Sequence, residues 1–198
     1  MDLNGADASG SNFSAAFIED SGAVAISDTD ATVTDAQQTL LTNLKLIVSA
    51  NPDGAAESLT VAGESIPLNA DVTSSGSVGS TTFLVTYVAA SRTCIATVSS
   101  GSGAIADFQT LLRRISYNNT SNTPATTNRA IDITANDGTA DSTIATVTIT
   151  VTASNDAPTA TNLSAAETYT EDTTRNLTDI VLSDVDSATV TATLTLSN

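Results

Sequence analysis

Short runs of alternating apolar and polar residues recur along the first three-quarters of the chain. Val, Ile and Thr dominate these runs, and Gly, Asn, Asp and Ser separate them. Alternation with a period of two places the apolar side chains on one face of a strand, and many such runs divided by polar turns are typical of an all-β sandwich. The pattern predicts strands at residues 13–18, 23–27, 44–49, 58–62, 82–88, 94–99, 115–118, 130–135 and 144–152.

One segment departs from the period of two. Its large apolar residues are spaced three, three, one and three positions apart, at Ile105, Phe108, Leu111, Leu112 and Ile115. That spacing puts them on one side of a helix. We therefore expect a short helix over residues 104–113 within the otherwise all-β module.

A polar stretch over residues 153–159 interrupts the strand pattern, and Pro158 within it cannot donate a hydrogen bond to a sheet. We place a module boundary there, with a β-sandwich over residues 1–154 and a linker plus the N-terminal part of a second module over residues 155–198. Candidate strands follow at 168–170, 177–182 and 189–196. These are too few to close a sandwich, so the second module is expected to be incomplete.

A sequence signature appears in both modules. Ser-Ala-Ala at 14–16 and Ile-Glu-Asp-Ser at 18–21 return as Ser-Ala-Ala at 164–166 and Thr-Glu-Asp-Thr at 170–173, an offset of 150 to 152 positions. Self-similarity at a fixed period is the signature of a repeat protein. The chain is therefore expected to belong to an array of β-modules.

The net charge of the chain limits the classes of molecule that it is expected to bind. Six Lys and Arg residues stand against 22 Asp and Glu, which gives a formal net charge of −16. Such a surface repels phosphate backbones, and no apolar run approaches the length of a membrane span, so we expect neither nucleic-acid binding nor membrane insertion. Crowded carboxylates favour a divalent counter-ion, for which calcium (Ca²⁺) is the natural candidate.

Catalytic and zinc chemistry lack their usual residues. The chain has no His, one Lys and one Cys, Cys94, which lies in an alternating run and is expected to be a packed small apolar residue. A pair of acids acting as in a glycosidase is the remaining catalytic alternative. We expect a protein that is not an enzyme.

Asp184 and Asp186 are the first candidate calcium ligands. Positions i and i+2 of an extended segment face the same way, so both carboxylates can bind one hard cation. Glu171 and Asp172 upstream add carboxylate oxygens. The alternative is a solvated acidic loop.

Asn155 and Asp156 in the linker complete this candidate set. Together with the four acidic residues of the second module, Glu171, Asp172, Asp184 and Asp186, they would supply oxygen ligands where the two modules meet. The sequence thus predicts a calcium site built from the linker and the beginning of the second module.

The first module carries a weaker version of the same set. Glu19 and Asp20 correspond to Glu171 and Asp172, but Asp35 is followed by Gln37 and Gln38, so the second carboxylate of the triplet is lost. A cation there would be bound more weakly or not at all.

Two other acidic segments add candidates. The stretch from Asp28 to Asp30 is a candidate substitute for the lost triplet, although Val33 and Thr39 stand where an EF-hand requires Gly and Glu. Asp137, in Asn-Asp-Gly, has the composition of a hairpin turn, and its carboxylate can also face an ion.

Three motifs together resemble a known family. They are Asn-Asp-Ala-Pro at 155–158, Tyr-Asn-Asn-Thr-Ser at 117–121 followed by Arg129, and Ala-Asn-Asp-Gly-Thr at 135–139 followed by a Thr/Val strand. The chain is similar in these to the cadherin-like tandem repeats of very large secreted bacterial proteins, including RTX-type adhesins. The glycine-rich nonapeptides of the calcium-binding secretion signal do not occur in it.

The resemblance implies an immunoglobulin-like or cadherin-like β-sandwich, calcium near module junctions, and a role in a cell-surface or matrix adhesin. The partners implied are neighbouring repeats, and the expected location is extracellular or on the cell surface. Two alternatives remain: a carbohydrate-binding module that holds cell-surface or matrix polysaccharide, and a fibre subunit that forms homo-oligomers by strand addition.

Overall fold

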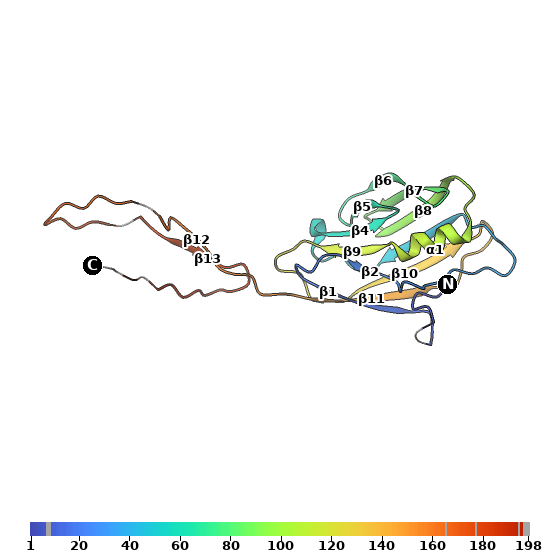
Figure 1. Cartoon of the computed structure of the whole chain (residues 1–198), viewed down its shortest axis with the longest axis horizontal. Coiled ribbons are helices and arrows are strands. Elements are labelled where there is room, and N and C mark those ends of the chain that lie inside the picture. The colour runs from blue at the N-terminus through green and yellow to red at the C-terminus, as the bar shows by residue number, and fades with distance from the viewer. Residues whose placement is uncertain (7–8, 165, 177, 194, 196–198) are drawn as a thin grey trace. The chain divides into compact units, whose positions relative to one another are not determined.

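The computed structural model of the chain describes residues 1–6, 9–164, 166–176, 178–193 and 195 (Figure 1). It divides into two compact units, Met1–Ala153 and Ser154–Asn198, which we call the first and the second unit. The division falls one residue earlier than the boundary expected from the sequence.

The first unit is an all-β sandwich with one short helix, as the alternating pattern predicts. Its seven-stranded sheet has the order β1-β11-β10-β3-β8-β7-β6, and its four-stranded sheet has the order β2-β9-β4-β5. The strands of the larger sheet are β1 (Phe13–Ile18), β3 (Asn43–Val48), β6 (Val72–Val78), β7 (Thr81–Val88), β8 (Thr93–Ser100), β10 (Arg129–Asn136) and β11 (Ala145–Thr152). Those of the smaller sheet are β2 (Val24–Ala25), β4 (Glu57–Val61), β5 (Glu64–Pro67) and β9 (Ser116–Asn119), and a 3-10 turn, η1 (Gly54–Ala56), precedes β4.

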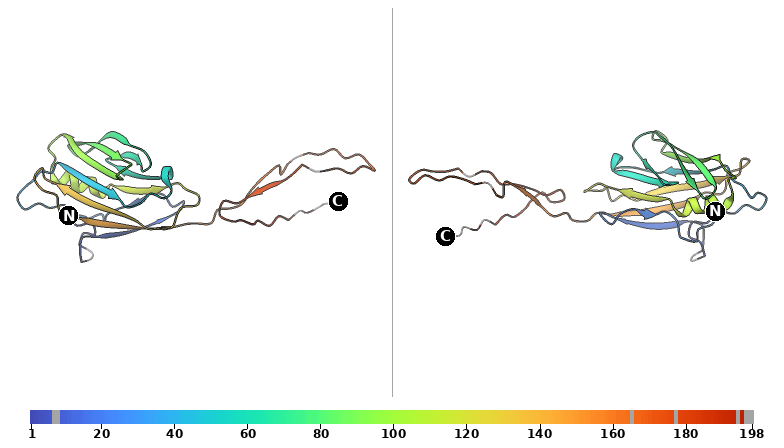
Figure 2. Two further views of the ribbon diagram at one scale, coloured as in Figure 1. Left: turned by 180° about the vertical axis from the view of Figure 1, so that it is seen from behind. Right: turned by 45° about the horizontal axis from the view of Figure 1, so that its top comes forward.

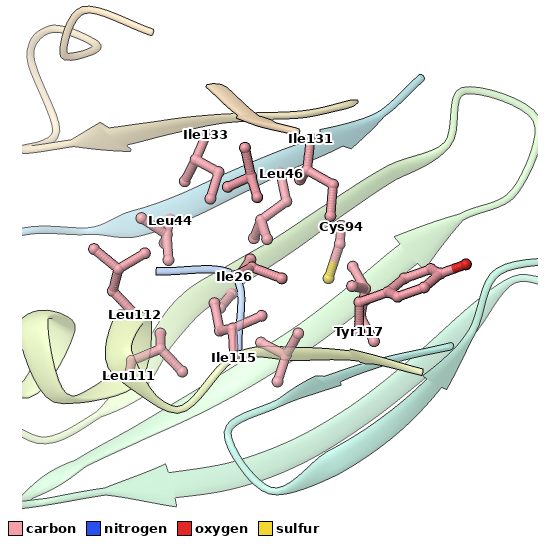
Figure 3. Close-up of a cluster of buried hydrophobic side chains, with 14 of the residues drawn as sticks. Ile26, Leu44, Leu46, Cys94, Leu111, Leu112, Ile115, Tyr117, Ile131 and Ile133 are labelled. Atoms are coloured by element: carbon pink, nitrogen blue, oxygen red, sulfur yellow. The ribbon is translucent and has the colours of Figure 1, made fainter. Parts of the chain in front are cut away.

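The hydrophobic core lies between the two sheets (Figure 3). Leu44 and Leu46 of β3 and Ile131 and Ile133 of β10 face it from the larger sheet, and Tyr117 of β9 faces it from the smaller one; all five are fully buried. Alternate residues of each strand therefore supply the core, as a period of two requires.

The helix α1 (Ile105–Arg113) confirms the predicted change of period. It carries the chain from β8 in one sheet to β9 in the other and buries Phe108, Leu111 and Leu112. The ring of Phe108 meets Phe83 of β7 edge-on at a centroid distance of 5.0 Å. The apolar face read from the sequence is thus the face that packs on the sheets.

The first and last strands of the unit, β1 and β11, run parallel and side by side, coloured blue and orange in Figures 1 and 2. Every other strand pairing in the unit is antiparallel. All nine strands predicted in this unit overlap strands of the structure.

The sequence pattern did not predict two strands, β5 and β6. The sequence of β6 is Val-Thr-Ser-Ser-Gly-Ser-Val, which has no large apolar residue between its ends. It forms an edge of the larger sheet, where polar side chains on both faces are tolerated. Gly76 is required by packing, because a Cβ at this position would lie 2.1 Å from the carbonyl oxygen of Ala62.

Over its described residues, the second unit contains one antiparallel pair, β12 (Thr159–Thr161) and β13 (Val181–Ser183). The predicted strand at 168–170 is wrong, and so is the one at 189–196 over its described residues, since neither segment has strand structure; residues 194 and 196 lie outside the described part. The predicted strand at 177–182 overlaps β13 only at its end, and residue 177 is not described. Alternation alone does not make a strand, because each strand needs a hydrogen-bonding partner.

Candidate cation sites and a buried ion pair

The Glu-Asp signature folds into the same turn in both units. Asp20 has a positive φ of 62°, and Asp172 has a φ of 61°. In each turn the residue after Asp donates its N–H to the residue before Glu, from Ser21 to Ile18 over 3.1 Å and from Thr173 to Thr170 over 3.3 Å. The repeat seen in the sequence is therefore also a repeat of backbone conformation.

The two turns differ in how they present their carboxylates. Glu19 follows β1 and is only 3% exposed, and its N–H donates to the carbonyl of Thr152 at the end of β11. Asp20, Glu171 and Asp172 are exposed. Only Glu19 is thus held within a packed environment.

In the second unit the linker and the acidic triplet come together. The N–H of Asp156 donates to Oδ2 of Asp186 over 2.6 Å, although the two residues are 30 positions apart. Oδ1 of Asp184 accepts N–H groups from Asp186 at 3.0 Å and Ser187 at 2.7 Å. The amide of Asn155 donates to the carbonyl of Asp156 over 2.6 Å. We call these four residues, Asn155, Asp156, Asp184 and Asp186, the linker cluster.

Glu171 and Asp172 stand apart from the linker cluster in the chain. They occupy the middle of the segment 162–180 that joins β12 to β13 (Figure 1). Among the described residues, no three Asp, Glu, Cys or His side chains lie close enough together to hold a metal ion. The six residues predicted to form one calcium site therefore do not form a preformed metal site.

The carboxylates of the linker cluster already accept backbone N–H groups. Calcium takes six to eight oxygen ligands at short range. These bonds use only Oδ1 of Asp184 and only Oδ2 of Asp186, so each carboxylate has a second oxygen to offer an ion. The cluster supplies ligands of the right chemistry in an arrangement that closes turns.

Asp35 and Asp137 also hold turns closed. Oδ1 of Asp35 accepts N–H groups from Gln37 at 2.7 Å and Gln38 at 2.8 Å. Oδ1 of Asp137 accepts those of Thr139 at 2.7 Å and Ala140 at 2.8 Å. The bonds from Ala140 and Thr139 lower the pKa of Asp137. The turn predicted between β10 and β11 is confirmed.

The structure adds a cluster that sequence reasoning found only in part. Asp28 and Asp30 were singled out, but Asp2 and Asn4 lie beside them, because the N–H of Asp28 donates to the carbonyl of Leu3 over 2.8 Å. The N–H of Ala6 donates to Oδ2 of Asp30 over 3.1 Å.

The loop around Asp30 is closed tightly. Gly5, at a φ of 59°, leaves room for this carboxylate, since a Cβ there would lie 1.5 Å from Oδ1 of Asp30. Within the described residues, the Oδ1 atoms of Asn4 and Asp30 are buried without a hydrogen bond. We call Asp2, Asn4, Asp28 and Asp30 the N-terminal cluster.

Arg129 forms a buried ion pair that the sequence pattern did not reveal. Its side chain is fully buried, and Nε donates to Oε1 of Glu57 over 2.8 Å while Nη2 donates to Oδ2 of Asp53 over 2.7 Å. Nη1 donates to the carbonyls of Ala125, at 2.7 Å, and Thr127. Glu57 lies on β4 and Arg129 on β10, so the pair joins the two sheets.

Burial and pairing act in opposite directions on the pKa of Glu57. Desolvation is the larger effect and raises this pKa, and the hydrogen bond and charge of Arg129 oppose the rise. A carboxyl group shifted in this way can signal an active site, but its partner here is a fully buried guanidinium. We interpret the pair as structural.

Cys94 is fully buried on β8, among the side chains of Figure 3. Burial raises the pKa of its thiol from 9.0 to about 12. Iodoacetamide at pH 8 is therefore expected to alkylate Cys94 only after unfolding in urea, as measured by mass spectrometry. Because the folded thiol holds its proton more tightly than the unfolded one, this residue should lower stability as pH rises from about 9 toward 12. Rapid alkylation of the folded protein would contradict the buried position.

Aromatic side chains are mostly used in packing. Phe17, Phe83, Phe108, Tyr87 and Tyr117 are buried. Of the other two, Phe13 is partly buried and Tyr169 is 67% exposed. A sugar-binding surface usually presents several exposed aromatic rings, and these positions do not supply one.

Comparison with known proteins found no match: no protein-family model, no curated protein and no solved structure is similar to this chain. Over the residues described, no helix is both long and apolar enough to cross a membrane.

Proposed function

We propose that this chain is part of a structural repeat in a large extracellular surface protein that serves adhesion or attachment to a matrix. The observation that carries the proposal is the recurrence of the Glu-Asp turn, with φ values of 62° and 61° at Asp20 and Asp172. A turn that repeats in both sequence and conformation indicates modules joined in tandem. Arrays of small β-modules act as spacers that hold a binding site away from a surface.

A structural role rather than a catalytic one fits the distribution of charged groups. The chain has no His, and the buried carboxylate of Glu57 is paired with Arg129. Asp35, Asp137 and Asp184 accept hydrogen bonds from the backbone of their own turns. These groups stabilise loops and sheets without presenting a nucleophile beside a base.

Calcium is the partner that the charge favours. A formal charge of −16 places many carboxylates near one another, and a divalent cation reduces their repulsion. The linker cluster and the N-terminal cluster each combine Asp and Asn oxygens, the ligands that calcium prefers. Coordination by the linker cluster would hold residues 155–156 against residues 184–186 and so stiffen the chain where one module follows another.

Calcium binding can be tested on the whole chain. Adding calcium to the chelator-treated protein is expected to release measurable heat and to slow cleavage at residues 155–158 in limited proteolysis. At a free calcium concentration of 100 times the Kd, the stabilisation would be about 2.7 kcal/mol for one site. Isothermal titration calorimetry and thermal melts measure these effects.

Matched variants locate the ion. Asp186→Asn should abolish the calcium-dependent protection of residues 155–158, and Asp30→Asn should leave it intact. Asp141→Asn serves as the control, because Asp141 is exposed and pairs with Lys45 at 3.3 Å outside both clusters. No heat at millimolar calcium, with unchanged proteolysis, would contradict the calcium part of the proposal.

A further inference from the structure

We infer that the first unit bears tension applied along the chain, and that the parallel pair β1–β11 is the element that resists it. This goes beyond a spacer role, because a spacer can be stiff or flexible without withstanding force. The load-bearing role needs neither a bound cation nor an adhesive target.

The direction of the two strands determines how they are loaded. β1 is the first strand of the unit and β11 the last, and they pair in parallel register from Phe13 opposite Val147 to Ile18 opposite Thr152. Tension from the preceding chain must first release Asp2 and Leu3, whose N–H groups donate to Thr32 and Ser11, before it reaches the start of β1. Tension from the following chain leaves at the end of β11. These points lie at opposite ends of the pair, so the strands are pulled along their length.

A pair pulled in this way shares the load among its hydrogen bonds. In parallel strands these bonds are evenly spaced, and sliding one strand past the other stretches all of them together. An antiparallel hairpin pulled apart at its open end instead loses its bonds one after another. The force needed to separate β1 from β11 should therefore be much larger when the strands slide than when they peel apart.

Hydrogen bonds continue beyond both ends of the pair. Oδ1 of Asn12 accepts the N–H of Thr146 over 2.8 Å at the start of β1. The N–H of Glu19 donates to the carbonyl of Thr152 over 3.0 Å at its end. The resisting segment thus extends from residue 12 to residue 19.

Packing behind the strands opposes the same sliding motion. Phe17 of β1 and Val147, Ile149 and Val151 of β11 are buried. The ring of Phe17 meets Tyr117 of the opposite sheet edge-on, at a centroid distance of 5.5 Å and an interplanar angle of 86°. Displacing β1 along its axis must uncover Phe17 as well as break the ladder.

The two sides of the pair are not equally supported. β11 also pairs with β10 on its other side, whereas β1 forms an edge of the sheet. Once Asp2 and Leu3 are released, the β1–β11 contact is therefore where the sheet should yield first under load.

Single-molecule force spectroscopy on the full chain tests the inference. Cys94→Ala removes the only native thiol, so two introduced cysteines can serve as unique attachment points. Ser11→Cys with Ala153→Cys loads β1 and β11 at opposite ends of the pair. Ser21→Cys with Ala153→Cys applies force at the end where Ile18 meets Thr152, so β11 is peeled away from that end.

The mean unfolding force is expected to be several-fold higher for attachment at residues 11 and 153 than at residues 21 and 153, at the same pulling speed. Urea denaturation should give the two proteins equal stability, so that only the direction of loading differs. Equal unfolding forces in the two geometries would overturn the inference.

Two additional measurements identify the pair as the source of resistance. Asn12→Ala should lower the force for attachment at residues 11 and 153 and leave that at 21 and 153 unchanged, because it removes a bond at the far end of the pair. Loss of the difference between geometries on adding a chelator would overturn the inference by assigning the resistance to calcium. Persistence of the difference supports it even if the calcium proposal fails.

Discussion

Replacing Arg129 with Ala is expected to lower the free energy of unfolding by about 3–5 kcal/mol, since removing one partner of a buried ion pair leaves the other charge uncompensated. Glu57 is fully buried on β4, so its carboxylate would lose the guanidinium that offsets its burial. The carbonyls of Ala125 and Thr127 also lose their donor. Urea denaturation followed by tyrosine fluorescence measures the loss, because the chain has three Tyr and no Trp.

The matched control is Arg175→Ala. Arg175 pairs with Glu167, but the arginine side chain is 50% exposed. An exposed pair of this kind contributes about 0–1 kcal/mol. If Arg129→Ala and Arg175→Ala changed stability equally, the buried pair would not have the structural role assigned to it.

The pH dependence of the Arg129→Ala variant provides a second check. Without Arg129, the two largest effects that oppose desolvation are lost, and the pKa of Glu57 should rise further. A carboxyl group whose folded pKa lies above its unfolded value stabilises the fold at low pH and loses that contribution as pH rises through the interval between the two values. The difference between wild type and variant should therefore shrink on acidification.

Replacing Phe108 with Ala is expected to lower the free energy of unfolding by about 3–5 kcal/mol, the usual range for truncating a buried Phe. The side chain is fully buried and holds α1 against Phe83 of β7. Removing the ring leaves a cavity beneath a helix of nine residues, which is too short to be stable without tertiary contacts. Urea or thermal denaturation measures this loss.

Phe13→Ala is the control for Phe108→Ala. Phe13 lies on β1 and is only partly buried, so the same chemical change removes less apolar surface from the core. A clearly smaller loss is expected. A loss at Phe108 no greater than at Phe13 would show that α1 is not anchored by its aromatic side chain.

The elements with strong local patterns could be read from the sequence. The run over residues 13–18 alternates and forms β1, and the three- and four-residue spacing from Ile105 to Leu112 forms α1. β6 was missed because its middle contains only Thr, Ser and Gly, and its place in the sheet depends on pairing with β7. An edge strand is held by pairing with another segment, so its own residues need not show a strong strand pattern.

The candidate ligands also divide into those placed by local sequence and those placed by long-range contacts. The turns at Asp35, Asp137 and Asp184 use hydrogen bonds to residues two or three positions away, so they depend on local sequence. Of the three, the turn at Asp137 was predicted. The N-terminal cluster joins residues more than twenty positions apart, and the bond from Ala6 to Asp30 could not be anticipated. Asp156 and Asp186 were assigned to one set by their chemistry, and the pairing of β12 with β13 brought their segments together.

The amino-acid sequence by itself determined the all-β class, the helix, the boundary near residue 154 and the repeated Glu-Asp signature, because periodicity and turn composition depend on neighbouring residues. Only the tertiary structure decided that Arg129 meets Glu57 across 72 positions and that β1 lies parallel to β11. Those contacts depend on which strands become neighbours in the sheets. That arrangement involves segments far apart in the chain, so no local window of residues contains it.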